Sequence, residues 1–408
     1  MPTTQQKIIT FFFRHPEPFV RMVSEFYAFQ PHEIQKYFQQ LNIGWLSKNE
    51  CCQWDSATIN LLKDQINWEH FSIYSQAFAD TNLIDEFITY IVWKDFDPSI
   101  LSSNCLSSNS HVPWSAEFIG KYKNYIDFEG LSANPDVPWS EELLTKFDGR
   151  WNWLGLSMNK GLPWSEEFIA RYEDLIDWEC LITFNYNIPW SVSLVEKYFH
   201  KFDHSEDGNF SINGLLYSNV EIIEKFGDFL CWGSIGCNPY LPWFEENLLE
   251  RWKDRLHWVS LIQNQTLMKD PQFYENILDK CIAKPKKAFF ILSLVPTLPW
   301  SISYIDRFIN YWEWSFLSSN WGLPWSMELI DYYLDKWDWG DYIRTKEGSV
   351  SGMTGLINNS TIPWDIDWIL KYEKFIDIES LSLQPMIWDK VFKPYMDEKM
   401  VDTVFRLI

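Results

Sequence analysis

The side chains best suited to chemistry lie together in one short segment near the middle of the chain. His200 and His204 are four residues apart, so a helix would place both imidazoles on one face, with the carboxylates of Asp203 and Asp207 beside them. Imidazole and carboxylate groups in this arrangement can bind zinc or a similar divalent metal. The segment also matches part of a calcium loop, but Gly214 stands where a bidentate Glu is required. A metal-binding site here is one hypothesis, and a surface or packing role for the histidines is its alternative.

No other sequence motif points to catalysis. The chain has no Gly-rich phosphate loop, no Gly-x-Ser-x-Gly elbow, no His-Glu-x-x-His and no Cys-x-x-Cys. Ser and Asp are numerous, but they recur at one position of a repeated motif, whereas a nucleophile is expected once. We therefore expect no enzymatic activity, no cofactor and no small-molecule substrate, unless the histidine segment binds a metal.

The strongest pattern is the dipeptide Pro-Trp, which recurs at intervals of about 25 residues. Its tryptophans are Trp114, Trp139, Trp164, Trp190, Trp243, Trp300, Trp325 and Trp364. In several copies a Ser follows the Trp and a Glu follows two residues later, as in Trp164, Ser165 and Glu167. The Ser can cap a helix, the Glu complements the helix dipole, and the Trp can pack on the first turns. Each copy therefore predicts the start of a helix, and its Trp is assigned to the core.

A second motif is Asp-Trp-x-x-Leu-Ser-x-Asn, and its Trp lies 14 residues after many of these tryptophans, as Trp178 follows Trp164. It predicts a short second helix with its own cap. Because neither helix can bury its apolar side alone, successive repeats must stack. The sequence therefore predicts an all-α fold, an α-solenoid of about a dozen helix-turn-short-helix repeats of about 25 residues. The degenerate repeat at Asp270 has lost Pro-Trp but has Pro271 at the first helical position, and we expect a longer helix there.

The predicted domains follow from where this pattern begins and ends. We expect an N-terminal helical cap over 1–53, the tandem-repeat array over 54–387 and C-terminal capping helices over 388–408. The motif Trp-x-x-Leu-Ser-x-Asn-x-x-x-Pro-Trp resembles short tandem helical repeats in uncharacterised bacterial and giant-virus proteins, from about residue 45 to about residue 390. That resemblance implies a helical repeat fold and no known activity.

The charge balance restricts the possible partners. A formal net charge of −22 repels phosphate backbones and anionic lipids, so nucleic acid and membrane surfaces are poor candidates and a basic protein is a better one. The longest apolar run is too short to cross a bilayer. We see no secretion signal, and the seven cysteines show no regular pairing, so we expect a cytoplasmic location.

Candidate partner-binding residues come from two features, the repeated first-turn glutamates and two insertions at the same point of the template, 205–213 and 340–355. The candidates are Glu117, Glu142, Glu167, Glu206, Asp207, Glu328, Arg344, Lys346 and Glu347. A parallel row of basic residues, such as Lys121 and Lys371, lies later in the same helices. The alternative for the glutamates is dipole complementation alone. Trp312 and Trp321 fall outside the template positions and are expected to be exposed.

These observations favour a non-enzymatic scaffold for protein–protein interaction, with an acidic inhibitor or immunity-type protein that binds a basic partner as its most concrete form. Two alternatives stay open. One is a metal-dependent enzyme or metal-binding protein centred on His200, Asp203, His204 and Asp207. The other is an acidic protein that mimics nucleic acid and competes with it for a basic protein.

Overall fold

The computed structural model describes residues 2–97, 102–202, 219–340, 343–344, 350–351 and 355–408. This part of the chain is all-helical apart from two antiparallel pairs of two-residue strands, β1 (Phe96–Asp97) with β2 (Ser102–Ser103) and β3 (Ile343–Arg344) with β4 (Val350–Ser351). The chain divides into two compact units: unit 1 holds Met1–Met22 and Cys231–Ile408, and unit 2 holds Val23–Leu230. The predicted domain bounds at residues 53 and 387 are not tested by this division and stay a prediction.

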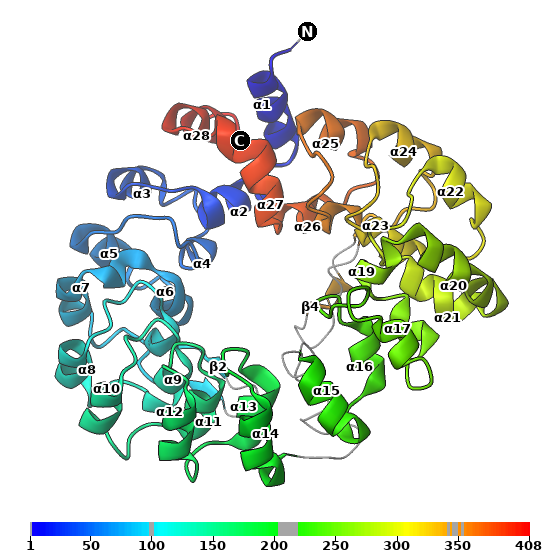
Figure 1. The fold of residues 1–408 in the computed structure, drawn as a ribbon. Helices are drawn as coiled ribbons and strands as arrows, with labels where there is room; N and C mark the ends of the chain where they lie inside the picture. The colour runs from blue at the N-terminus through cyan, green and yellow to red at the C-terminus, as the bar shows by residue number, and fades with distance from the viewer. Residues whose placement is uncertain (1, 98–101, 203–218, 341–342, 345–349, 352–354) are drawn as a thin grey trace. The chain divides into compact units, whose positions relative to one another are not determined.

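Unit 2 contains short helices that follow one another in chain order (Figure 1). They are α3 (Pro31–Tyr37), α4 (Ile43–Leu46), α5 (Ser56–Leu62), α6 (Trp68–Tyr74), α7 (Thr81–Glu86), α8 (Ala116–Tyr122), α9 (Phe128–Ala133), α10 (Glu141–Lys146), α11 (Trp153–Met158), α12 (Glu166–Tyr172), α13 (Trp178–Phe184), α14 (Val192–Tyr198) and α15 (Val220–Phe226). In the part of this unit that the structure describes, 3₁₀ turns lie at η1 (Gln76–Ala79), η2 (Leu106–Ser108), η3 (Phe199–Lys201) and η6 (Gly227–Phe229). The helix α2 (Pro16–Phe26) contains the point of division between the units.

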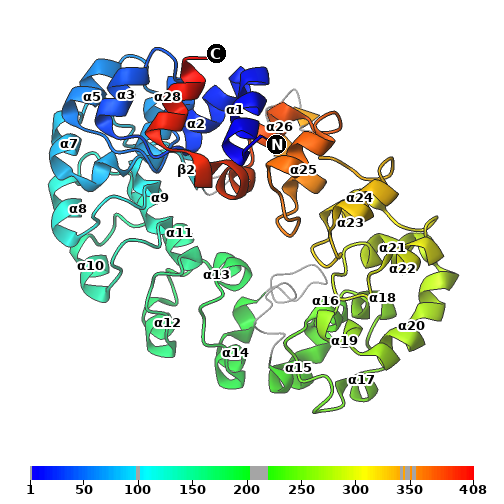
Figure 2. The same ribbon diagram turned by 90° about the horizontal axis from the view of Figure 1, so that it is seen from above.

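Unit 1 combines the first helix of the chain with those of its second half (Figure 2). They are α1 (Thr4–Arg14), α16 (Trp232–Cys237), α17 (Leu248–Arg251), α18 (Trp258–Leu261), α19 (Gln265–Met268), α20 (Pro271–Ala283), α21 (Pro285–Leu292), α22 (Ile302–Arg307), α23 (Trp314–Ser319), α24 (Met327–Tyr332), α25 (Ile366–Tyr372), α26 (Ile378–Ser382), α27 (Pro385–Ile387) and α28 (Glu398–Phe405). Shorter elements are the 3₁₀ turns η7 (Leu356–Asn358) and η9 (Lys393–Tyr395) and the π-helical turn η8 (Trp388–Phe392). The expected longer helix at Asp270 is confirmed, since α20 has 13 residues.

The predicted helix starts are confirmed at the level of single hydrogen bonds. Ser115, Ser140, Ser165 and Ser326 each accept a hydrogen bond from the backbone N–H three residues later, at 3.1 Å in every case. The Asp that precedes the second Trp acts in the same way, because the side chain of Asp177 accepts from the N–H of Cys180 at 2.9 Å. These caps satisfy N–H groups that the first turn of a helix leaves without a partner, so each short helix has a fixed start.

A buried Asn joins each of many repeats to the repeat before it, and we call this set the asparagine ladder. It comprises Asn49, Asn109, Asn134, Asn159, Asn185, Asn264, Asn320 and Asn359. Asn159 shows the pattern: its Nδ2 donates to the carbonyls of Ser132 and Asn134 at 2.8 and 3.0 Å, and its Oδ1 accepts from the N–H of Gly161 at 2.7 Å. The carbonyl of Asn159 in turn accepts from the indole Nε1 of Trp164 at 2.8 Å. The ladder satisfies backbone groups that packing removes from water.

A serine adds a second repeated bond between neighbouring repeats. The hydroxyl of Ser157 accepts from the N–H of Asp177, 20 residues later, at 2.9 Å. Ser132 and Ser318 do the same for Asn152 and Asp338, also 20 residues later and at 2.9 Å. Such bonds fix the start of each second helix against the repeat before it, because both partners are shielded from water.

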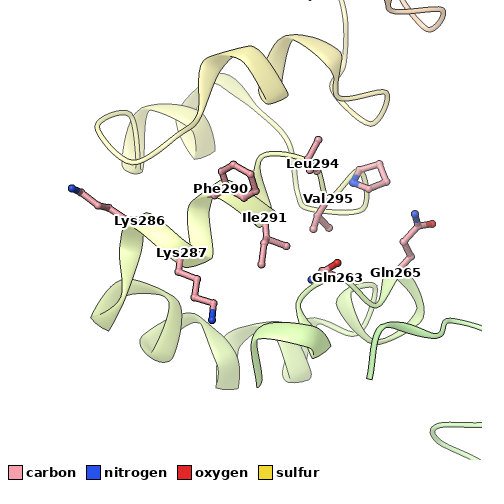
Figure 3. A pocket seen from close by; sticks show the side chains of 9 residues that line it. Gln263, Gln265, Lys286, Lys287, Phe290, Ile291, Leu294 and Val295 are labelled. Carbon is pink, nitrogen blue, oxygen red and sulfur yellow. The ribbon is translucent and has the colours of Figure 1, made fainter. Parts of the chain in front are cut away.

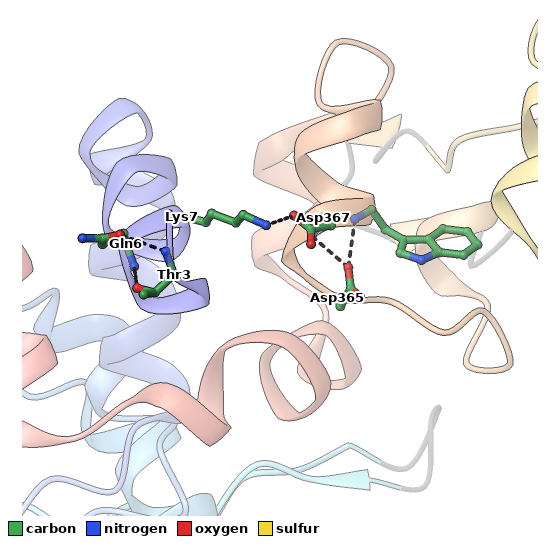
Figure 4. Close-up of polar contacts among 6 residues, drawn as sticks. Thr3, Gln6, Lys7, Asp365 and Asp367 are labelled. Carbon is green, nitrogen blue, oxygen red and sulfur yellow. Dashed lines mark hydrogen bonds and ion pairs between the residues drawn. The ribbon is translucent and has the colours of Figure 1, made fainter. Parts of the chain in front are cut away.

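Within unit 1 the N-terminal helix packs on elements from the far end of the chain. The ring of Phe12 lies 4.7 Å from that of Phe392. Lys7 forms an ion pair with Asp367 at 2.5 Å, as Figure 4 shows, and His15 lies 2.7 Å from a carboxylate oxygen of Glu373. Both apolar and polar contacts therefore join α1 to the region of α25 and η8. None of the described helices is long and apolar enough to pass through a bilayer.

Candidate binding surfaces

The histidine segment falls largely outside the described residues. His200 lies exposed at the 3₁₀ turn η3, while Asp203, His204, Glu206 and Asp207 lie outside the part of the chain that the structure describes. Over the described residues alone, no group of three or more His, Cys, Asp or Glu side chains could hold a metal ion. The predicted metal site therefore stays a prediction.

The second insertion is described only in part. The backbone of Arg344 lies in strand β3, and Lys346 and Glu347 lie outside the described residues. Their predicted role in binding a partner is not tested.

The predicted partner-binding glutamates occupy equivalent positions at the starts of their helices. Glu117, Glu142 and Glu167 in unit 2 and Glu328 in unit 1 are each the second residue of a helix that begins after a capping Ser. We call these four the helix-start glutamates, and all four are exposed. Hydrogen bonds from its own backbone N–H and from the Ser115 hydroxyl lower the pKa of Glu117. The same two kinds of bond, with Ser165 as the cap, lower the pKa of Glu167, so both carry a negative charge near neutral pH.

In α10 and α12 the residue just before the helix-start glutamate is also a Glu, and it contacts the next repeat. Glu141, immediately before Glu142, forms an ion pair with Arg171 of the next repeat. Glu166, immediately before Glu167, accepts a hydrogen bond from the Ser191 hydroxyl at 3.1 Å. In α10 and α12, therefore, the first of two adjacent glutamates contacts the next repeat, although both are exposed.

The row of basic residues is largely paired within each unit. Lys121 pairs with Asp85 of α7 at 2.7 Å, and Lys371 pairs with Asp331 of α24 at 2.6 Å. Lys225 pairs with Glu196 in the same way. The next residue shares the acid, because the hydroxyl of Tyr372 donates to Asp331 at 3.0 Å. The predicted basic row is thus mainly a set of contacts between repeats.

The Lys371–Asp331 pair predicts a small loss of stability at acid pH. The Lys371 ammonium, followed by the Tyr372 hydroxyl, lowers the pKa of Asp331. A carboxyl whose pKa is lower in the folded state contributes stability above its unfolded pKa, and this stability is lost as the pH falls through the folded pKa. Because both side chains are about half exposed, Asp331→Asn should cost at most about 1 kcal/mol at pH 7.

Urea unfolding at pH 7 and at pH 3 tests this expectation. The difference between wild type and Asp331→Asn should shrink at pH 3, because the carboxyl of the unfolded chain is then largely protonated while Lys371 opposes protonation of the folded one. Asp335 is an exposed acid just after the C-terminal end of α24, which contains Asp331. Asp335→Asn is therefore the matched control, and stability should change little at either pH. A difference for Asp331→Asn that is equal at both pH values would contradict the assignment.

The Pro-Trp tryptophans are mostly in the core. Trp114, Trp139, Trp164, Trp243, Trp300 and Trp364 are buried, and Trp190 and Trp325 are partly exposed. Of the two tryptophans expected to be exposed, Trp321 is 55% exposed, as predicted, but Trp312 is only 6% exposed, so that prediction is wrong. The indole Nε1 of Trp312 donates to the carbonyl of Ile305 at 2.9 Å, and its ring lies 5.1 Å from that of Trp300. Trp312 is therefore a core residue outside the template.

A pocket in unit 1 was not anticipated from the sequence. It lies beside α21, has a volume of about 790 Å³ and is lined by Gln263, Gln265, Lys286, Lys287, Phe290, Ile291, Leu294, Val295 and Pro296. The signal that could have revealed it is the irregular repeat that begins at Asp270. The adjacent lysines Lys286 and Lys287, directly after Pro285, are a second signal, because cations are disfavoured at a helix start.

Comparison of the chain with protein-family models, with curated proteins and with solved structures finds no match. The resemblance to bacterial and giant-virus repeat proteins therefore stays a prediction.

Proposed function

We propose that the chain is an α-solenoid of tandem repeats that serves as a non-enzymatic protein-binding scaffold. In this proposal its helix-start glutamates bind a basic partner protein, in the manner of an acidic inhibitor or immunity-type protein. The expected location is the cytoplasm.

The repeated bonds between neighbouring repeats support the solenoid. The asparagine ladder and the serine bonds join residues about 20 to 28 positions apart in most cases, which is close to one repeat. In a solenoid each repeat contacts mainly its neighbours, and its stability depends on those contacts. A surface of this kind presents equivalent residues at regular intervals, as protein-binding solenoids do.

The functional proposal rests on one difference between the acidic and the basic side chains: the basic ones form ion pairs, and the helix-start glutamates are exposed. Basic side chains such as Lys121, Arg171 and Lys225 are engaged by acids of the same unit. The helix-start glutamates Glu117 and Glu167 are exposed, and the lowered pKa of each favours its charged form. The chain as a whole carries a net charge of −22. The exposed glutamates can therefore bind a partner, whereas these basic side chains are already paired with acids of the same unit.

The exposed negative charge would first affect the rate at which the partner associates. A surface with an excess of one sign attracts a partner of the opposite sign over several ångströms and raises the rate of encounter. Exposed charges at the rim of an interface are weakened by salt, so the complex should dissociate more readily at high ionic strength. An obligate apolar interface would show the opposite behaviour.

A comparison of two charge-matched triple variants tests the proposal. The first variant carries Glu117→Gln, Glu142→Gln and Glu167→Gln at the starts of α8, α10 and α12. The second carries Asp64→Asn, Asp148→Asn and Asp174→Asn. These substitutions remove three exposed acids just after the C-terminal ends of α5, α10 and α12 in the same unit. Both variants lose the same net charge, so only the position of the lost charge differs.

Each protein is immobilised and used to capture partners from a lysate of the native cells at low salt. We expect wild type and the Asp variant to retain the same stoichiometric basic protein, and the Glu variant to retain about tenfold less of it. Absence of any stoichiometric partner, or equal retention by the two variants, would contradict the proposal.

A further inference from the structure

The pocket beside α21 lies where the repeat pattern is broken. The preceding helix α20 has 13 residues, whereas α8, α10 and α12 have six or seven. The asparagine ladder is also interrupted here, because Val295 stands at the ladder position and has no amide side chain. Part of the pocket wall therefore comes from a repeat that has a longer first helix and no ladder Asn.

The walls of the pocket are apolar in the middle and polar at two sides. Figure 3 shows the side chains of Phe290, Ile291 and Val295 between two lysines of α21 and two glutamines, one just before α19 and one at its first residue. Phe290 is 49% exposed and Leu294 is 45% exposed, so apolar surface faces the space. The volume of about 790 Å³ lies within the range of small-molecule sites, roughly 300 to 1,000 Å³.

Two positive charges lie at the start of α21. Lys286 and Lys287 occupy the first turn of α21, and the residue before the helix, Lys284, provides no side-chain cap. Cations at a helix N-terminus are disfavoured by the helix dipole. Among the residues that the structure describes, no carboxylate forms an ion pair with Lys286 or Lys287, in contrast to Lys371 and Lys121. Local features that oppose stability in this way are expected where a site serves a ligand.

We propose that this pocket binds a small amphiphilic monoanion, namely a carboxylate on an apolar body. Lys286 and Phe290 are four residues apart on α21, as are Lys287 and Ile291, so each lysine lies next to an apolar side chain on the helix surface. A carboxylate can accept charge-assisted hydrogen bonds from the ammonium groups while its apolar body covers Phe290 and Leu294.

The polar and apolar parts of the pocket together define the ligand class. A ligand without charge would leave the two lysines without a partner, and a cation would be repelled by them. A multiply charged polar anion would gain little from the exposed apolar surface of Phe290 and Leu294. The site is separate from the helix-start glutamates, since it rests on a different set of residues with the opposite charge.

Isothermal titration of the full chain with sodium decanoate, below its micelle concentration and at low ionic strength, tests the proposal. Decanol and decyltrimethylammonium serve as neutral and cationic probes of the same chain length. The test variant is Lys286→Gln with Lys287→Gln. The control is Lys269→Gln with Lys280→Gln, which removes two exposed lysines that do not line the pocket.

We expect saturable one-to-one binding of decanoate that is at least about tenfold tighter than that of decanol. The test variant should weaken decanoate binding by about tenfold or more, and the control should change it by no more than about twofold. Equal binding of decanoate and decanol, equal effects of the two lysine pairs, or no saturable binding would overturn the proposal. Flotation with phosphatidylglycerol vesicles separates a lipid surface from a free acid, and lysine-dependent flotation without decanoate binding would also overturn it.

Discussion

Replacing Asn159 with Leu should lower the free energy of unfolding by about 2 to 5 kcal/mol. Asn159 is 2% exposed, and its amide makes three hydrogen bonds with the backbone, to the carbonyls of Ser132 and Asn134 and from the N–H of Gly161. Leu has a similar size but can neither donate nor accept. The carbonyl of Asn134 keeps the indole Nε1 of Trp139 as a donor, but the carbonyl of Ser132 and the N–H of Gly161 lose the partner that Asn159 provides. A buried backbone group without a partner costs roughly 1 to 3 kcal/mol.

Asn187→Leu is the matched control for this prediction. The Nδ2 of Asn187 also donates to a backbone carbonyl of the preceding repeat, that of Lys160 at 2.8 Å, but this bond is exposed. Water can replace an exposed bond, so the control should cost less than about 1 kcal/mol. Urea unfolding followed by circular dichroism measures both. Equal losses for the two variants would show that burial of the ladder does not contribute to stability.

Gly322→Ala should be strongly destabilising, because the added methyl group would overlap backbone atoms of another loop. A Cβ at this position would lie 1.9 Å from the carbonyl oxygen of Pro296 and 2.4 Å from its Cα. Both contacts are with backbone, so the chain itself must move. We expect a loss of roughly 1 to 3 kcal/mol or more, the cost of overpacking a closely packed contact.

Gly120→Ala tests the same chemical change where space is available. Gly120 lies within α8, and a Cβ there would meet no atom within 4 Å. Ala is favoured over Gly inside a helix, so this variant should gain about 0.5 to 1 kcal/mol. Thermal unfolding of the two variants should therefore move in opposite directions. A Gly322→Ala protein as stable as wild type would mean that the close approach of the two loops is not required.

Local features of the fold could be predicted from the sequence, because their causes lie within a few residues. The cap at Ser165 acts on the N–H of Phe168, and the cap of α20 lies at Asp270 with Pro271 next to it. The all-helical character follows from the spacing of apolar residues in each repeat. The burial of Trp312 could not be predicted in this way, since it depends on contacts with Trp300 and with the backbone of Ile305.

Contacts between repeats are the part that sequence reasoning missed. The motif contains the ladder Asn, but its partners are 25 and 27 residues earlier in the case of Asn159. Glu141 and Glu142 are adjacent and chemically the same, and only Glu141 pairs with Arg171 of the next repeat. Which of two neighbouring glutamates faces the next repeat is a property of stacking geometry. The pocket beside α21 depends on the same geometry, because its walls come from two neighbouring repeats.

We propose that the helix-start glutamates bind a basic partner through charge. The most direct test is the affinity of the captured partner for wild type, for the Glu117→Gln, Glu142→Gln, Glu167→Gln variant and for the Asp-to-Asn control, each measured at low and at high salt. We expect weaker binding by the Glu variant at low salt, a smaller loss of its affinity on adding salt, and wild-type behaviour of the control. An affinity that is independent of salt and equal for all three proteins would contradict the proposal.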